Sequence, residues 1–309
     1  MSDTSFGTIF AQWMHDEHNL LAMRPAYRLL FTLFTLVTIG LQAQIELDLV
    51  EMCELPSVID ESSGLAIAGE RSLWTHNDRG GNAEIFEVDV RGELLRTVEL
   101  TDVTVHDMED VAMDKDGMLF IGDFGNNKKD RLKLSILRVD PRQIQENKVR
   151  PEVIEFLLPD NGLNSKCHYD IEAMIWSKGR LVMFTKDRCD ENNNHLVIYS
   201  VPDEPGHYTA AKMGEFYWEE PDKCIKITGA DLSPDGKKLV LLSRNGLHFF
   251  FAYNRDEYFN GSYRYLELED RKREGLVHYG DCELFISEEA KKGAKAKLWK
   301  LNLCSIGFN

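Results

Sequence analysis

Two short acidic stretches of this chain have the same form, and their residue types suit cation binding. Residues 105–111 read Val-His-Asp-Met-Glu-Asp-Val, and residues 169–173 read Tyr-Asp-Ile-Glu-Ala. In each stretch an Asp and a Glu lie two residues apart, where a hydrophobic strand is expected to begin. Because residues two apart on a strand share a face, the pattern predicts paired carboxylates at two strand starts.

Further acids occur at other expected strand starts. If the strands form antiparallel meanders around a common channel, the starts of the first strands lie at one mouth of that channel. Converging carboxylates raise one another's pKa unless a cation balances them, and oxygen ligands suit Ca²⁺, with Mg²⁺ or Mn²⁺ behind it. We therefore predict a Ca²⁺ site with ligands from Glu61, Asp107, Glu109, Asp170, Glu172 and Asp231. The alternative is that these acids cap strand ends, accept backbone N–H groups and pair with Arg.

Polar residues at the expected ends of second strands would surround this cation. The predicted ligand-binding set is His76, Asn77, Asp78, Arg79, Asp123, Asn126, Lys186, Arg244 and Glu274. Its cations, with Arg131 and Arg188, could hold a phosphate or carboxylate beside the metal, or they could simply pair with the acids. His76, His106 and His168 flank the same mouth, where each could be a general base or a ligand.

The glycines of residues 122–127, Gly-Asp-Phe-Gly-Asn-Asn, have a separate expected role. We expect them to serve tight turns with positive φ. No helix follows them, so they do not form a phosphate-binding loop.

The elements that must position these residues are strands, because short runs of apolar residues alternate with turn residues. The runs fall into sets of four, and the last set has only three. They are 64–68, 72–76, 84–89 and 94–100; 110–114, 118–122, 134–139 and 153–158; 172–176, 180–185, 196–201 and 212–218; 230–233, 238–243, 248–253 and 263–268; and 275–278, 282–286 and 297–301. Asp116-Gly117 and Asp235-Gly236 have the chemistry of hairpin turns.

Repeated four-strand meanders are typical of a β-propeller. We predict an all-β fold of five blades with four antiparallel strands each, closed by a strand at 45–52 that completes the last blade. Mid-strand aromatics such as Trp74, Phe120 and Phe184 should pack between blades. Two repeats exceed the usual ~40–50 residues, with the excess in expected loops at 141–151, 159–168, 187–195 and 202–207. A six-bladed ring with one degenerate blade is the alternative.

The N-terminal region predicts export. Arg24 and Arg28 precede an apolar run at 29–39, and Leu41-Gln42-Ala43 approximates a cleavage site. We therefore interpret 1–22 as an upstream extension that is not structural, 23–43 as a signal peptide and 44–309 as one propeller domain. An uncleaved anchor is the alternative. All six cysteines follow residue 44; an even count in an exported chain permits disulfides, and buried thiols are the other reading.

Several phrases together resemble a known group of proteins. They are Leu55-Pro56, residues 61–65 (Glu-Ser-Ser-Gly-Leu), 73–78 (Leu-Trp-Thr-His-Asn-Asp), 107–110, 120–127 and 169–174. In this order they resemble exported bacterial β-propeller proteins of the SdiA-regulated group and their esterase-like phytase relatives. The resemblance is good over about residues 55–200 and looser in the rest of the chain. The resemblance implies an exported, Ca²⁺-binding propeller. Phytase-type hydrolysis uses carboxylate-bound cations together with Lys or Arg for the phosphate.

The composition limits the partners. A net charge of −16 argues against nucleic acid and anionic membrane surfaces as binding partners. We therefore expect contact with a membrane only through the signal segment. We expect a periplasmic, secreted or surface-exposed monomer that binds a small or extended ligand at the channel mouth. A metal-dependent hydrolase of phosphate or other esters is the alternative, and a scaffold with a vestigial channel is a third reading.

Overall fold

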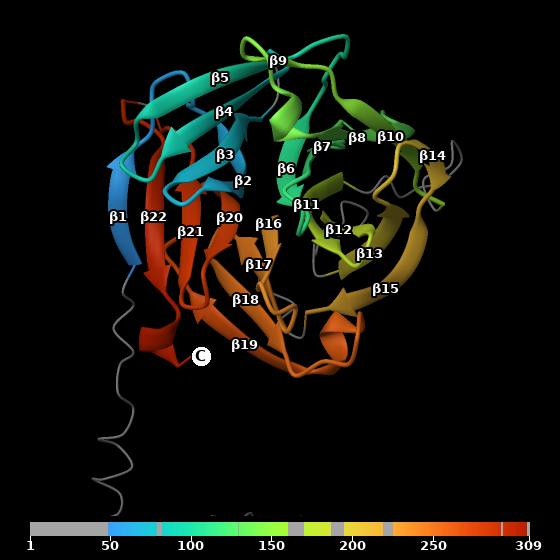
Figure 1. The fold of residues 1–309 in the computed structure, drawn as a ribbon. Coiled ribbons are helices and arrows are strands. Elements are labelled where there is room, and N and C mark those ends of the chain that lie inside the picture. The colour runs from blue at the N-terminus through green and yellow to red at the C-terminus, as the bar shows by residue number, and fades with distance from the viewer. Residues whose placement is uncertain are drawn as a thin grey trace, which may run out of the picture. The chain divides into compact units, whose positions relative to one another are not determined.

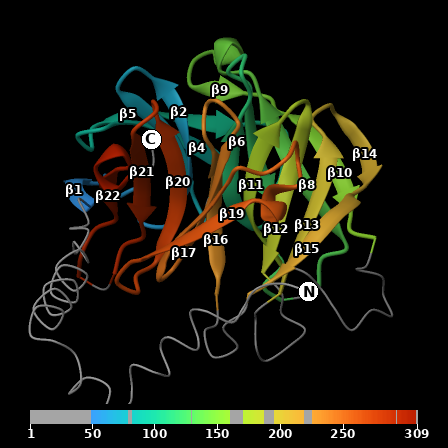
Figure 2. The same ribbon diagram turned by 90° about the horizontal axis from the view of Figure 1, so that it is seen from below.

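The computed structural model describes residues 49–78, 82–128, 130–159, 170–186, 195–218, 225–291 and 293–307. These residues form five sheets arranged as the blades of a β-propeller (Figure 1). Figure 2 shows the blades from the side, with their inner strands running along the central axis. No α-helix occurs in the described ranges, and none of their helical turns is long and apolar enough to cross a membrane.

Each blade has four antiparallel strands, which follow one another from the channel outwards. Blade 1 has β2 (Ser62–Gly69), β3 (Ser72–Asn77), β4 (Glu84–Asp89) and β5 (Leu94–Leu100); blade 2 has β6 (Met108–Met113), β7 (Leu119–Asp123), β8 (Lys133–Val139) and β10 (Glu152–Leu157); blade 3 has β11 (Asp170–Ser177), β12 (Arg180–Lys186), β13 (His195–Pro202) and β15 (Ala211–Tyr217); blade 4 has β16 (Ile227–Leu232), β17 (Lys238–Ser243), β18 (Gly246–Phe251) and β19 (Ser262–Glu267); blade 5 has β20 (Arg273–Tyr279), β21 (Glu283–Glu288), β22 (Lys297–Asn302) and β1 (Leu49–Glu54).

The predicted architecture is confirmed. The blades number five, each of the predicted runs overlaps a strand, and the N-terminal strand β1 pairs antiparallel with β22 to complete blade 5. Asp116-Gly117 and Asp235-Gly236 lie in hairpin turns, and both glycines have positive φ. Blade 5 is therefore completed only when the N-terminal strand pairs with a strand from the C-terminal part of the chain.

Two of the expected loops contain strands that the sequence analysis missed. Within the expected loop 141–151, β9 (Lys148–Val149) pairs parallel with β5 of blade 1. At the end of the expected loop 202–207, β14 (Gly206–Thr209) begins, and it pairs parallel with β10 of blade 2. Both connections leave the third strand of one blade and reach back to the outer edge of the blade before it. They cover backbone groups that an edge strand would otherwise expose.

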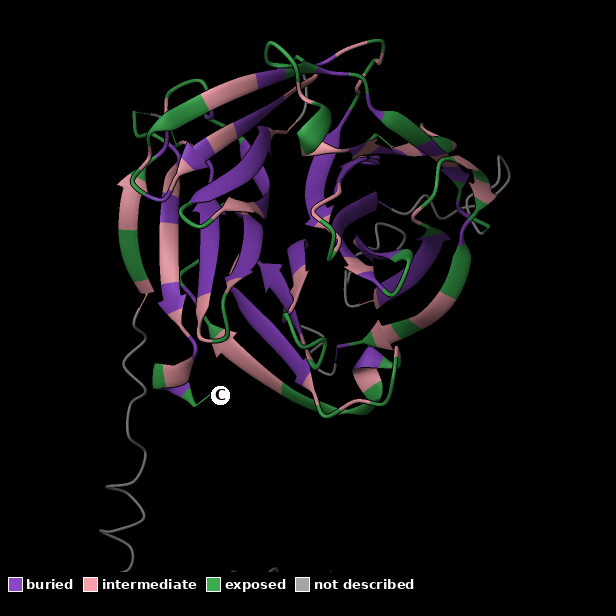
Figure 3. Cartoon of the chain, viewed as in Figure 1, coloured by how far each residue is buried: buried purple, intermediate pink, exposed green. Residues whose placement is uncertain are grey.

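The core lies between the blades. Five clusters of buried apolar side chains each join two neighbouring blades. Trp74, Phe120 and Phe184 belong to these clusters, as predicted. Figure 3 shows the inner strands largely buried and the outermost strands partly exposed. Interlocking side chains of adjacent blades thus hold the ring together.

Polar side chains also link the innermost strands around the channel. Ser63 Oγ of β2 donates to the carbonyl of Glu109 at 2.5 Å, and the Asp110 carboxylate of β6 accepts the N–H of Met174 on β11 at 2.8 Å. Thr228 Oγ1 of β16 donates to the Arg273 carbonyl at 2.6 Å. These contacts fix how adjacent first strands align, and so they fix the height of the side chains at the mouth.

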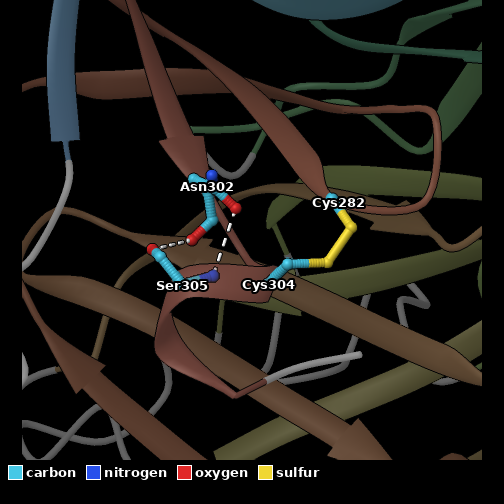
Figure 4. The surroundings of a disulfide bond; sticks show 4 residues. All are labelled: Cys282, Asn302, Cys304 and Ser305. Atoms are coloured by element: carbon cyan, nitrogen blue, oxygen red, sulfur yellow. Dashed lines mark hydrogen bonds between the residues drawn. A yellow bond between two sulfur atoms is a disulfide. The ribbon is translucent and has the colours of Figure 1, made fainter.

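One disulfide joins Cys282 and Cys304, which links the start of β21 to the C-terminal 3₁₀ turn (Cys304–Ile306) (Figure 4). Cys53 is a half-buried free thiol, and burial raises its pKa to about 11, which makes it unreactive. Cys167, Cys189 and Cys224 lie outside the described residues.

Candidate functional site

The first strand of every blade is irregular near its start. The pairing with the second strand shifts at Glu109 in blade 2, Glu172 in blade 3, Thr228 in blade 4 and Glu274 in blade 5. Blade 1 shifts between Ser63 and Ala66. An inserted residue interrupts the alternation of side chains and redirects one of them. Three of these positions carry a glutamate, which places three carboxylates at equivalent points around one mouth.

Two groups of carboxylates meet at this mouth. Asp78, Asp107 and Glu109 form one group, and Glu109, Asp170 and Glu172 form the other. Within each group one oxygen per residue lies within 4.8 Å of the others. The predicted pairs Asp107/Glu109 and Asp170/Glu172 are therefore brought together from blades 2 and 3. Asp78, predicted as a ligand-binding residue, joins them from the end of β3.

Glu109 is the member that the two groups share. The residue is only 6% exposed, and its Oε1 has no hydrogen-bond partner within the described part of the chain. Burial, followed by the charges of Glu172, Asp78, Asp170 and Asp107, raises the pKa of Glu109 well above its usual value. An ionised carboxylate in such a place needs a balancing positive charge.

The loop after β7 shapes one wall of the site. Gly125 does not have the expected positive φ; instead, a Cβ there would lie 2.2 Å from Glu109 Oε1 and 2.6 Å from Asp107 Oδ2. A Cβ at Gly122 would collide with the Phe124 ring. The expectation that these glycines serve positive-φ turns was wrong. They allow backbone and ring to approach closely.

Two residues of the predicted ligand-binding set, together with Arg131, hold this loop. Asp123 accepts the N–H groups of His106 and Asp107, and Arg131 donates to its carboxylate and to the Gly125 carbonyl. The Asn126 side chain accepts the N–H of Arg131, and the backbone N–H of Asn126 donates to Asp170 at 2.5 Å. Asp123 and Asn126 thus set the positions of Asp107 and Asp170.

Lys186 lies at the same mouth, at the end of β12. Its ammonium group contacts the carboxylate of Glu172, and both side chains are about nine-tenths buried. Burial raises the pKa of Glu172 to about 8, although Lys186 acts in the opposite direction. The pKa of Glu274 is also well above its usual value because of burial and the nearby charge of Glu172. Glu274 therefore borders the cluster from blade 5.

Other predicted ligands lie apart from this cluster. Asp231 is farther along β16, where its Oδ2 is 2.8 Å from Nδ1 of His278 and accepts the backbone N–H of the same residue. Glu61 is exposed, and its N–H donates to Asn77. Arg244 Nε lies 3.3 Å from Asp270 Oδ1, and the Arg244 side chain is 42% exposed. Neither Asp231 nor Glu61 belongs to the carboxylate groups found among the described residues.

The histidine and amide at the end of β3 have structural contacts. His76 is fully buried, and burial lowers its pKa to about 4, so its ring is neutral at pH 7. The Asn77 amide donates to the Val58 carbonyl at 2.8 Å and fixes the segment before β2. Arg79, Arg188 and His168 fall outside the described residues.

A cavity of about 550 Å³ opens beside the cluster. Asp107 and Gly125 form the side of the cavity that faces the carboxylates, and His106, Asn127 and Lys128 lie around it. A ligand in this space would touch polar groups of both signs.

Sequence reasoning did not assign a site role to Gly125 or expect the bulges. The Asp-x-Glu repeat identified four of the five carboxylates. Asp78 was assigned to the ligand-binding set and not to the metal ligands, because it follows a second strand and does not precede a first strand. Its position in the His-Asn-Asp run at the end of β3, beside the next blade's acidic start, is the signal that could have identified it.

Comparison with known proteins gives weak similarities only. No family model matches the chain, and no curated protein matches it. A PQQ-bound aldose sugar dehydrogenase structure from Streptomyces coelicolor is 11% identical over 84% of this chain and 98% of that chain, with a TM-score of 0.45. A gluconolactonase from Xanthomonas campestris is 13% identical over 78% and 72%, with a TM-score of 0.43. The extracellular domain of a hybrid two-component system from B. thetaiotaomicron is 12% identical over 77% and 27%, with a TM-score of 0.37. Similarities of this size carry no argument about activity.

Proposed function

We propose that this protein is an exported β-propeller that binds Ca²⁺ at its acidic channel mouth and a small or extended ligand in the cavity beside it. It acts as a binding or interaction module, and the resemblance of its sequence motifs to the SdiA-regulated group supports export and Ca²⁺ binding. The observation that carries the proposal is the buried Glu109 carboxylate, which lies where two groups of acids meet and has an Oε1 without a partner among the described residues.

The choice of Ca²⁺ follows from ligand type. All five residues offer carboxylate oxygens, which hard cations prefer. Within each group the oxygens lie within 4.8 Å of one another, so one ion could contact all three. Ca²⁺ accepts several carboxylates in flexible geometry, whereas Mg²⁺ demands near-ideal octahedral geometry and usually keeps several waters.

The ligand site is proposed from the cavity. Asp107 belongs both to a carboxylate group and to the cavity wall, so a ligand there would lie next to the cation. Lys128 and Asn127 offer donors, and Asp130 offers an acceptor, which suits a polar ligand. Export is supported by the Cys282–Cys304 disulfide, because such bonds persist in oxidising compartments.

Calorimetric titration of the purified protein with Ca²⁺ tests this function. We expect saturable binding that Asp107→Asn weakens by more than about tenfold. Asp116→Asn is the matched control: this exposed carboxylate lies in the turn at the other end of β6, and its variant should bind like the wild type. The absence of any binding heat, with a folded protein confirmed by circular dichroism, would refute the proposal.

A metal-dependent ester hydrolase is the second candidate, favoured by the buried Lys186 ammonium beside the carboxylates. Such a group could hold an anionic ester while a cation activates water. Phosphomonoesters and diesters assayed with and without Ca²⁺ distinguish the two functions. Turnover that is lost in Asp107→Asn and Glu172→Gln, with the fold intact, would favour the hydrolase. Binding without turnover would favour the module.

A further inference from the structure

We propose that the channel mouth holds a pair of cations, with the Glu109 carboxylate bridging them and Lys186 setting the order in which they bind. This inference rests on the proposed function, because it requires that cations bind here at all. It goes further by assigning a separate ion to each carboxylate group and an unequal affinity to the two positions.

The geometry separates the carboxylates into two ligand sets. Asp78 and Asp107 approach Glu109 from the side of blades 1 and 2, and Asp170 and Glu172 approach it from blade 3. The two sets have only Glu109 in common. A carboxylate has two oxygens and can give one to each of two ions, as carboxylates do in two-metal sites with ions about 3.5–4 Å apart. One position then lies between blades 1 and 2, and the other between blades 2 and 3.

The state of Glu109 points to a ligand independently of how many acids are near it. The residue is more than nine-tenths buried, yet its Oε1 accepts no hydrogen bond from the residues that the structure describes. Oε1 faces Asp107 and the backbone of Gly125, where any side chain would collide with it. Leaving a buried carboxylate oxygen unsatisfied is costly, so this atom is placed for a bound cation.

Lys186 makes the two positions unequal. Its ammonium group already contacts Glu172, and both side chains are buried. A cation entering the set of Glu109, Asp170 and Glu172 must share Glu172 with that ammonium or displace it, and like charges so close repel strongly. The position at Asp78 and Asp107 therefore fills first. The position at Asp170 and Glu172 fills at a higher cation concentration.

Ca²⁺ titration by calorimetry, combined with native mass spectrometry, tests the number and order of sites. We expect about two equivalents in the wild type. Asp78→Asn should weaken the tighter step and Glu172→Gln the weaker step, each by more than about tenfold, and Glu109→Gln should weaken both. Lys186→Gln should tighten the second step by about tenfold or more while changing the first little. Asp116→Asn, remote from the mouth, should leave both steps unchanged.

Mn²⁺ in place of Ca²⁺ gives an independent readout of the bridge. Mn²⁺ ions that share a carboxylate are magnetically coupled, so the sharp hyperfine lines of isolated Mn²⁺ should weaken as the second equivalent binds. Glu109→Gln should abolish the coupled signal. Circular dichroism of each variant shows whether the fold persists, and a variant that fails to fold is replaced by the paired Asp107→Asn or Asp170→Asn, which address the same two positions.

The possible outcomes distinguish failure of the cation pair from failure of the proposed Ca²⁺-binding function. A single equivalent that both Asp78→Asn and Glu172→Gln weaken, or two equivalents without coupled Mn²⁺, would overturn the cation pair and leave cation binding intact. A second step that Lys186→Gln does not tighten would overturn the assigned order. No binding by either metal would overturn the proposed function itself.

Discussion

Glu109 combines burial, negative charge and an oxygen without a partner in the described structure. If this position were selected only for stability, we would expect a neutral side chain of the same shape there. Burial and four neighbouring carboxylates raise its pKa well above the usual value, which means that the ionised form is disfavoured in the folded protein. A residue that lowers the stability of the folded protein in this way is typical of a functional site.

The first prediction concerns this loss of stability. In metal-free buffer at pH 7, Glu109→Gln should be more stable than the wild type by on the order of 1 kcal/mol, because it removes a carboxyl group whose ionisation is disfavoured in the folded protein but not in the unfolded chain. Urea unfolding in the presence of a chelator measures the difference. Asp231→Asn is the contrasting variant and should lower stability, because Asp231 binds His278 through both its ring and its backbone. Equal or lower stability of Glu109→Gln would contradict our account of the site.

A second prediction concerns His248, a buried residue remote from the carboxylates. Its ring lies 3.0 Å from both Ser243 Oγ and Tyr263 OH and packs against Trp218 and Tyr265, and burial lowers its pKa to about 3. The folded state therefore binds fewer protons than the unfolded state between about pH 3 and 6.5. Stability from this residue is fully present above pH 6.5 and is lost as the pH falls through that window.

Urea unfolding between pH 4 and 6 measures this effect. The slope of stability against pH should decrease in His248→Gln by up to about 1.4 kcal/mol per pH unit relative to the wild type. Thr209→Ala is the control, because Thr209 is an exposed residue at the end of β14 that does not titrate, so its variant should keep the wild-type slope. A His248→Gln slope equal to that of the wild type would show that His248 is not held in its neutral form.

At the scale of the elements, most strands could be predicted because alternation of apolar residues and turn chemistry are both local signals. Asp116-Gly117 marks one hairpin through residues adjacent in sequence, and the structure has the turn there. The strands β9 and β14 gave no such signal. They have two and four residues, and each pairs parallel with a distant strand, so nothing in their own sequence specifies the partner.

The bulges explain which predicted ligands converge. The Asp-x-Glu repeat correctly brought Asp107, Glu109, Asp170 and Glu172 to one mouth, because the bulge falls on the Glu in both blades. In blade 4 the equivalent position is Thr228, and Asp231 follows three residues later. Its side chain therefore lies farther along the channel, beside His278. A period-two pattern cannot reveal this shift, because an inserted residue has no sequence signature of its own.

A third prediction concerns the loop that contains Gly125. Gly125→Ala leaves every charge in place but puts a methyl group where Glu109 Oε1 and Asp107 Oδ2 lie. We expect Ca²⁺ affinity to fall by more than about tenfold and stability by about 1–3 kcal/mol. Calorimetry and urea unfolding measure the two effects. The control is Gly214→Ala in β15, where a Cβ meets no atom within 4 Å. Unchanged affinity in Gly125→Ala would mean that the two carboxylates do not need this wall.

At the scale of the whole molecule, the ring explains how acids far apart in sequence share one site. Asp78 and Asp170 are separated by a complete blade in sequence, yet each lies beside Glu109. Each apolar cluster joins two neighbouring blades, so the position of one blade depends on the next around the ring. The ring is closed at blade 5, which has three strands from the C-terminal part of the chain and a fourth from the N-terminal part.

The last prediction follows from this closure. A chain that begins at residue 55 lacks β1 and leaves β22 as an open edge, without the contacts of Leu49 to the blade 5 core and of Glu51 to Lys297. Compared with a chain that begins at residue 47, it should lose about 2 kcal/mol or more of stability and tend to associate through the open edge. Thermal unfolding and size-exclusion chromatography measure both effects.

A synthetic peptide of residues 47–56 provides the control for this truncation. If β1 acts as the strand that closes the ring, the peptide should bind the shortened chain by pairing with β22 and restore both its melting temperature and its monomeric elution. A peptide in which Cys53 is replaced by Pro should restore less, because proline removes a backbone donor and restricts the strand. A shortened chain as stable as the longer one would show that blades 1–5 hold together without the N-terminal strand. The carboxylate site would then owe its alignment to the inner strands alone.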